Sequence, residues 1–155
     1  MKMGEYNVSN LATTKRPFCA AFMLIEQGGK YLFVKRKNTA WMDGYYGLPS
    51  GKVERGEGFL EAAVREAKEE VGVTVRLEDA EFVHLSCRND DMEWCDVMFL
   101  AKKWSGEPRN AEPDMHEEIA WFALDALPEN VVPPVGAMLE AWTAGKTYSE
   151  YHSEC

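Results

Sequence analysis

Three glutamates, Glu66, Glu69 and Glu70, crowd together in the stretch GKVERGEGFLEAAVREAKEEVGV, which covers residues 51–73. On a helix, carboxylates at this spacing repel one another by about 0.2–0.5 kcal/mol per pair. Near the end of a helix they also face the partial negative charge of the last carbonyls. Hard divalent cations such as Mg²⁺ favour carboxylate oxygens together with water and substrate phosphates as ligands. The cluster is therefore costly for a fold alone and indicates a metal site, in which Arg65 can orient a neighbouring carboxylate through its planar guanidinium.

The glutamates belong to a predicted helix over about residues 58–71, which Gly72 ends in the C′ position. At 100° per residue the three glutamates share one face of this helix. Another face is apolar and is expected to pack on a sheet. Its members are Leu60, Ala63, Val64, Ala67 and Val71.

The rest of the chain reads mainly as strands. A hairpin is predicted around Gly28 and Gly29, which supply positive φ, and a glycine-rich and aromatic loop then leads to the helix. The order ββ-loop-α-βββ-α indicates an α/β fold with a mixed β-sheet between helices. The predicted strands cover residues 18–27, 31–37, 73–87, 94–104 and 119–124, and a last helix covers about residues 135–144.

The totals bound the class of protein. With 155 residues, 46% of them hydrophobic, one domain is expected over residues 17–148, with an N-terminal tail or edge strand over 1–16 and a C-terminal tail over 149–155. The net charge of −9 argues against a nucleic acid polymer as partner. No apolar run reaches the roughly 20 residues that span a bilayer, and no signal-peptide core is seen. We therefore expect no membrane partner and a cytoplasmic location.

The four cysteines have neither CxxC nor zinc-site spacing. Cys87 and Cys95 could face each other across a hairpin. Reduced thiols are nevertheless expected, since disulfides are rare in cytosolic proteins.

The spacing of the fixed residues resembles the Nudix box, G-x5-E-x7-R-E-U-x-E-E-x-G-U with U aliphatic. All seven fixed polar or glycine positions match, and only Ala67 is small for its aliphatic position. Such a match at fixed spacing is of order 10⁻⁸ by chance when typical residue usage is near 7%. The matching positions are Gly51, Glu57, Arg65, Glu66, Glu69, Glu70 and Gly72.

The resemblance implies a MutT-like Nudix hydrolase with an α/β/α sandwich fold, acting on a nucleoside diphosphate linked to another moiety. It implies that Glu69 and Glu70 bind the metal, that Glu66 binds metal or activates water, and that Glu57 and Arg65 support the catalytic site. The backbone carbonyl of Ser50 is a further implied metal ligand. The implied cofactor is Mg²⁺, with Mn²⁺ as a possible substitute.

One further carboxylate is expected from the loop WSGEPRNAEP, which is similar to a MutT-like loop that supplies a catalytic or metal-binding glutamate. The spacing favours Glu112 for this role. Glu117 and Glu118 remain competitors, because the segment before the next strand is longer here than in MutT-like relatives.

Substrate contacts are predicted from residue type. Lys52 is placed to meet a phosphate, unless it is an ordinary surface lysine. Tyr46 and Trp94 are candidates to stack on a base, since base–aromatic stacking contributes about 1–3 kcal/mol. The other available aromatics are Trp41, Tyr45 and Trp121, and Asn89, Asp90 and Asp91 could read a base edge or simply form a turn.

The sequence therefore predicts Mg²⁺-dependent hydrolysis of a phosphoanhydride in a nucleoside triphosphate or related nucleotide by water attack. Two alternatives stay open. One is a pyrophosphatase of ADP-ribose or a nucleotide sugar, and the other is a Nudix domain that binds a nucleotide without cleaving it. The expected partner is a small-molecule nucleotide, and a homodimer is possible.

Overall fold

The predicted hairpin comes first among the elements of the computed structural model, which describes residues 17–153. Strand β1 (Phe18–Gln27) pairs antiparallel with β2 (Lys30–Arg36). Gly28 and Gly29 join them with φ of 58° and 76°, a region that glycine adopts without steric cost. The segment 1–16, expected as a tail or edge strand, lies outside the described residues.

The strands form one mixed sheet, as predicted, in the order β3-β2-β1-β6-β5-β8, with β4 paired to β1 and β7 to β2. Its central pair, β1 and β6, is parallel and runs in register from Phe18 opposite Trp94 to Ile25 opposite Ala101. Strands β5 and β6 form the second predicted hairpin. The remaining strands are β3 (Tyr46–Gly47), β4 (Ser50–Lys52), β5 (Ala80–Asn89), β6 (Glu93–Ala101), β7 (His116–Phe122) and β8 (Tyr148–His152).

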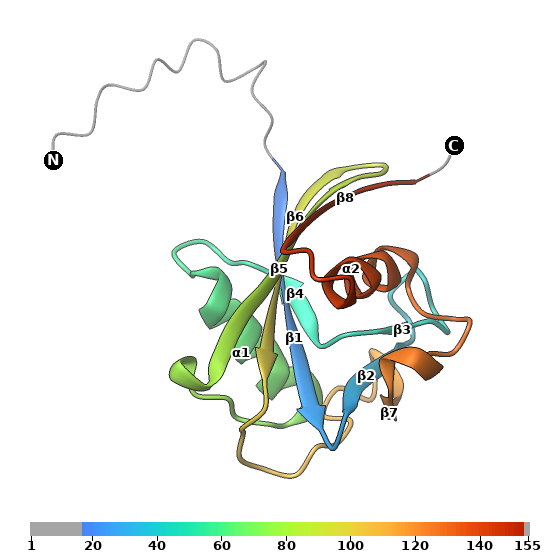
Figure 1. The fold of residues 1–155 in the computed structure, drawn as a ribbon. Coiled ribbons are helices and arrows are strands. Elements are labelled where there is room, and N and C mark those ends of the chain that lie inside the picture. The colour runs from blue at the N-terminus through green and yellow to red at the C-terminus, as the bar shows by residue number, and fades with distance from the viewer. Residues whose placement is uncertain (1–16, 154–155) are drawn as a thin grey trace, which may run out of the picture.

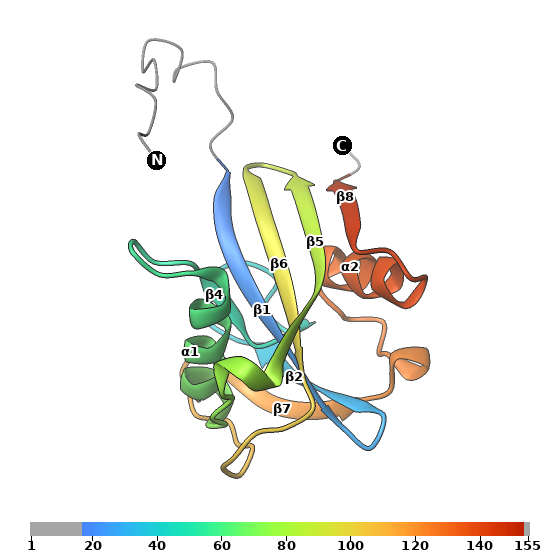
Figure 2. The ribbon, with the colours of Figure 1, turned by 60° about the vertical axis from the view of Figure 1, so that its left-hand side comes forward.

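Two helices cover opposite faces of the sheet (Figures 1 and 2). Helix α1 (Phe59–Val71) ends at Gly72, whose φ is 73°, as the sequence predicted. Helix α2 (Pro133–Thr143) begins with two prolines, which suit the first turn because its N–H groups lack intrahelical partners. The three layers give the expected α/β/α sandwich. Among the described residues neither helix is long and apolar enough to cross a membrane.

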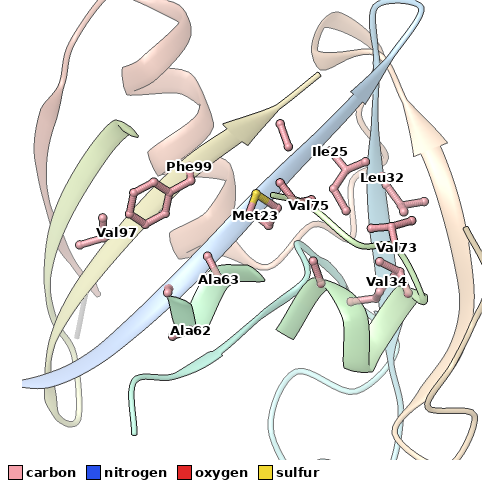
Figure 3. Packing of buried hydrophobic residues seen from close by; sticks show 14 residues of the cluster. Met23, Ile25, Leu32, Val34, Ala62, Ala63, Val73, Val75, Val97 and Phe99 are labelled. Atoms are coloured by element: carbon pink, nitrogen blue, oxygen red, sulfur yellow. The ribbon is translucent and has the colours of Figure 1, made fainter. Parts of the chain in front are cut away.

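Alternating side chains of the central strands divide the core into two clusters, one under each helix. Figure 3 shows the cluster under α1, where the helix contributes small side chains that let it approach the sheet closely. Of the predicted apolar face of α1, Ala63, Ala67 and Val71 are buried, but Leu60 and Val64 are only half-buried. The sheet residues under α1 include Met23, Ile25, Val97 and Phe99, and those under α2 include Phe22, Leu24, Met98 and Leu100.

The C-terminal segment differs from the expected tail. Strand β8 (Tyr148–His152) pairs parallel with β5, from Leu85 opposite Tyr148 to Asn89 opposite His152. The buried ring of His84 in β5 holds the segment that leads into β8. Its two ring nitrogens lie 2.8 Å from the Lys146 carbonyl oxygen and from Ser149 Oγ. This strand has no apolar pattern in the sequence because it lies at the sheet edge and its residues are exposed or half-buried.

Cys19 and Cys87 are free thiols in the described part of the chain. Cys87 and Cys95 lie directly opposite each other in the β5–β6 pair. The predicted proximity across the hairpin is therefore confirmed.

Candidate active site

The site is built where β4 passes the middle of α1. An ideal Cβ on Gly51 would lie 1.9 Å from Glu66 Oε1. Any residue other than glycine at position 51 would therefore collide with the Glu66 carboxylate where it now lies. Helix α1 is fixed at its start by Glu61, whose carboxylate accepts the Gly58 N–H at 2.9 Å. The glycine of the box thus lets the Glu66 carboxylate lie against the backbone of β4.

Arg65 holds three of the predicted carboxylates at once. Its Nε donates to Glu57 Oε1 at 2.7 Å and its Nη2 to Glu57 Oε2 at 3.0 Å. Its Nη1 donates to Glu66 Oε1 at 2.7 Å and to Glu69 Oε2 at 3.2 Å. The Lys52 carbonyl accepts a further bond at 3.2 Å. These bonds lower the pKa of Glu57 and raise that of Arg65, so the arginine and its bidentate partner Glu57 stay charged.

Glu70 is the most buried member of the cluster, with 7% of its surface exposed. The Ser50 N–H donates to its Oε2 at 3.3 Å. Burial, and next the neighbouring Glu66 and Glu112 charges, raise the pKa of Glu70 well above its ordinary value. Burial also raises the pKa of Glu66 despite its bond to Arg65. Two acidic groups that are disfavoured as anions point to a cation that would neutralise them.

The loop before β7 brings Glu112 to this cluster. The Arg109 N–H donates to the Val71 carbonyl and the Ala111 N–H to the Glu70 carbonyl, both at 3.0 Å. The loop therefore closes over the last turn of α1, and ligand atoms of Glu112, Glu70 and His116 lie within 4.8 Å of one another.

His116 was not identified from the sequence. It is 5% exposed, and its Nε2 lies 3.9 Å from Glu70 Oε2. Burial, and then the charge of Arg36, lower the pKa of His116 to about 4. The imidazole is therefore neutral at neutral pH, the state in which histidine binds metals. The only sequence signal was a histidine beside two glutamates in DMHEE.

The competitors of Glu112 have other partners. Glu117 forms an ion pair with Lys35 at 3.3 Å and is more than half exposed. Glu118 accepts a hydrogen bond from the Tyr46 hydroxyl, and this bond raises the pKa of Tyr46 to about 12. Among the three candidate carboxylates, only Glu112 lies in the group with Glu70 and His116.

Two neighbouring cavities with shared lining residues lie beside the cluster. The outer cavity, of about 530 Å³, is lined by Lys52 and Trp94 among others, and the inner cavity, of about 70 Å³, by Asp96 and the side chains of α2. They share four lining residues: Arg36, Trp41, Ser50 and Arg88. Since Ser50 also contacts Glu70, the cavities open next to the carboxylates.

The predicted substrate residues separate into two groups. Lys52 and Trp94 line the outer cavity, as does Trp41, and Lys52 Nζ lies 5.8 Å from the Trp94 ring centre. Tyr46 does not line either cavity. It is 9% exposed and packs edge-on against Phe122 with ring centres 5.0 Å apart, so the structure places it in the core.

Three further predicted residues also have defined places. Glu69 is half exposed and its described contact is with Arg65. Trp121 packs on Trp104 with ring centres 6.2 Å apart. Asp90 accepts a bond from Arg88 at 2.7 Å and lines the outer cavity.

The donor set fits a hard divalent cation. Glu70 and Glu112 have carboxylate oxygens within 4.8 Å of each other and of a His116 nitrogen. Glu66 is close enough to raise the pKa of Glu70, and the Ser50 backbone contacts Glu70. The close contact between Gly51 and Glu66 keeps that carboxylate in place. His116 adds an imidazole nitrogen, a donor that suits transition-metal ions better than Mg²⁺.

Comparison with known proteins agrees with this arrangement. The family described as NUDIX domain matches residues 15–142. The chain is 34% identical over 114 residues to an ADP-ribose pyrophosphatase of Methanocaldococcus jannaschii, covering 73% of this chain and 66% of that protein. It is 30% identical over 115 residues to an 8-oxo-dGTP diphosphatase of Escherichia coli, covering 74% and 86%. A solved structure of a MutT NUDIX hydrolase from Burkholderia pseudomallei is similar with a TM-score of 0.74 and 35% identity, covering 81% of this chain and 98% of that one.

Proposed function

The chain belongs to the Nudix hydrolase family, and from this premise we propose that it is a Mg²⁺-dependent enzyme that cleaves a phosphoanhydride bond of a nucleoside triphosphate or related nucleotide. The observation that carries the proposal is the meeting of buried acid groups with a basic and aromatic cavity. Glu70 and Glu112 lie together at one end, and Lys52 and Trp94 line the outer cavity that opens beside them. This combination suits a ligand with phosphates at one end and a flat ring at the other.

The roles of the residues follow from their positions. When bound, Mg²⁺ would neutralise charge on the phosphate oxygens and lower the pKa of a bound water. Glu66, Glu70 and the Ser50 carbonyl would hold it, and Glu69 would contribute from the exposed side. Arg65 and Glu57 keep the Glu66 carboxylate oriented through the bonds described above.

The attacking water needs a group to accept its proton. Glu112 is suited to this because it comes from a loop outside the helix and lies beside the cluster. Glu66 is the second carboxylate within reach of the same region. Lys52 offers positive charge to phosphate oxygens that lie in the outer cavity.

The other candidate function, a pyrophosphatase of ADP-ribose or a nucleotide sugar, is favoured by the identity to the archaeal ADP-ribose pyrophosphatase. Both reactions would use the same carboxylates and differ in what is attached to the diphosphate. We find no additional motif downstream of the Nudix box that would favour a pyrophosphatase of ADP-ribose or of a nucleotide sugar. We therefore place nucleoside triphosphates first.

The experiment is a panel of nucleotides, with ADP-ribose included, incubated with Mg²⁺ in water labelled with ¹⁸O. Mass analysis of the products identifies the substrate and the phosphorus atom that water attacks. Excess EDTA should abolish turnover, and Mg²⁺ or Mn²⁺ should restore it. An exposed glutamate of β5, Glu81, provides the control variant Glu81→Gln, which should behave as wild type. Full activity in EDTA, after tightly bound metal has been removed, would refute the metal-dependent mechanism.

A further inference from the structure

Asp96 is a buried charge in a row of apolar side chains. It lies on the central strand β6, opposite Ala20 of β1 and Ser86 of β5, and is 3% exposed. The next residues on the same face, Met98 and Leu100, belong to the core under α2. A carboxylate at this position is expensive unless hydrogen bonds compensate for the lost hydration.

Only one of the two Asp96 oxygens is compensated within the described residues. Oδ2 accepts a bond from Arg88 Nε at 3.0 Å, whereas Oδ1 is buried with no hydrogen-bond partner. Burial raises the pKa of Asp96, and Arg88 only partly opposes this. Since an apolar pair often replaces a buried ion pair without loss of stability, packing alone does not account for this carboxylate.

Asp96 lines the inner cavity, so a ligand that enters this cavity meets the aspartate side chain. The walls include the apolar residues Phe22, Leu48 and Met138, which suit the face of a flat ring. Ser50 lines both cavities and donates its N–H to Glu70. A nucleotide whose phosphates lie at the carboxylate cluster could therefore extend its base toward Asp96.

The polar groups of the inner cavity have a defined pattern. The guanidinium groups of Arg36 and Arg88 can only donate hydrogen bonds, and an ionised Asp96 can only accept them. Guanine offers the O6 and N7 acceptors that arginine commonly recognises, together with N–H donors at N1 and the 2-amino group. Adenine pairs a single amino donor with ring nitrogen acceptors and fills fewer of these positions.

Resting on the proposed function, we propose that Asp96 is the specificity-determining residue of the base site, and that its Oδ1 accepts a hydrogen bond from the 2-amino edge of a guanine nucleotide. Arg88 fixes the orientation of the carboxylate through Oδ2. Its guanidinium lies 4.8 Å from the Trp94 ring centre and 5.9 Å from that of Trp41, which restricts its movement.

The test compares kcat/KM for the triphosphates of guanosine, inosine and xanthosine with Mg²⁺. Wild type should favour guanosine by about tenfold or more over inosine, which lacks the 2-amino donor, and over xanthosine, which has a carbonyl there. In Asp96→Asn the amide oxygen faces Arg88, so the amide nitrogen faces the base. This variant should favour xanthosine over guanosine, because the new donor meets the 2-carbonyl.

A matched control is Asp90→Asn, which alters the other carboxylate that Arg88 contacts but leaves Asp96 in place. Whatever its effect on rate, this variant should keep the wild-type order of the three bases. If Asp96→Asn retains the guanosine preference, or loses all three substrates equally with an unchanged melting temperature, the assignment is overturned.

Other outcomes separate this inference from the function on which it rests. If Asp96→Asn does not fold, the wild-type ratio of guanosine to inosine decides, since a ratio near one overturns the base contact. Nucleotide hydrolysis by wild type without base preference refutes the role of Asp96 alone. No hydrolysis of any nucleotide overturns both proposals.

Discussion

Replacing Glu70 by glutamine should stabilise the metal-free protein while removing most of its activity. Glu70 is 7% exposed and lies beside Glu66 and Glu112. Its own burial and the charges of these two neighbours disfavour its ionised form. Glutamine keeps the size of the side chain and can still accept the Ser50 N–H. The substitution therefore removes the charge with little change in packing.

The size of the effect follows from the contacts. The i,i+4 repulsion with Glu66 is about 0.2–0.5 kcal/mol, and Glu112 should add a comparable amount. Together with the relief of desolvation, a gain of about 1 kcal/mol is expected, which raises the melting temperature by about 2–4 °C in a chain of this size. Mutation of residues that only orient a metal ligand lowers activity by about 10- to 100-fold. Loss of an oxygen that itself binds the metal should therefore lower kcat by at least about 10²-fold.

The pH dependence has a definite sign. Because the folded-state pKa of Glu70 is raised above 4.5, its protonated form is favoured in the fold, and this contribution is fully present below about pH 4. It is lost as pH rises through the folded-state pKa. In EDTA, wild type and Glu70→Gln should therefore melt together near pH 4, and the variant should melt increasingly higher toward neutral pH.

Calorimetric melting in EDTA from pH 4 to 8, repeated with Mg²⁺, measures these differences. Mg²⁺ should stabilise wild type more than the variant, because binding to the folded state adds stability according to affinity. Glu81→Gln should match wild type throughout. A variant that unfolds, or that melts several degrees below wild type in EDTA at neutral pH, would show that Glu70 is a structural residue and would refute the reasoning.

Two further predictions concern the loop and the box glycine. Glu112→Gln should lower kcat by about 10²–10⁴-fold if this residue is the base, whereas Glu117→Gln and Glu118→Gln should have smaller effects; a near-normal Glu112→Gln beside a crippled Glu117→Gln or Glu118→Gln would move the role to β7. Gly51→Ala should push the flexible end of Glu66 away from β4, since the added Cβ would lie 1.9 Å from its Oε1, and should lower kcat by about 10²-fold with a melting temperature within about 4 °C of wild type, which a normal kcat would contradict.

The helix of the box and its glutamates could be predicted because their signals are local. The period of α1, the ending at Gly72 and the spacing back to Gly51 all lie within 23 consecutive residues. Arg65 contacts Glu66 and Glu69 on its own helix and Glu57 in the loop just before it, so their proximity follows from the backbone. The hairpin turn at Gly28 was predictable for the same reason.

The loop glutamate shows where local signals end. Spacing favoured Glu112 over Glu117 and Glu118, but the choice depends on which carboxylate reaches the end of α1. Backbone bonds from the loop to Val71 and Glu70 bring Glu112 there, across some forty residues of intervening chain. Tyr46 was a candidate to stack on a base because it is an aromatic residue in a segment that was predicted to be a loop. In the structure it packs against Phe122 in the core instead.

By itself the sequence determined the family resemblance, the two-helix mixed-sheet plan and the acidic cluster, because each depends on residues close together in the chain. Only the tertiary structure brought Arg36, Arg88 and Asp96 around one inner cavity and His116 beside Glu70. These residues come from β2, β5, β6 and β7, and the parallel pairing of β1 with β6 joins segments about 75 residues apart. An aspartate in β6 has no distinctive local pattern in the sequence. The free-energy cost of its burial, and the binding role proposed for it, depend on neighbouring side chains that other strands and α2 supply.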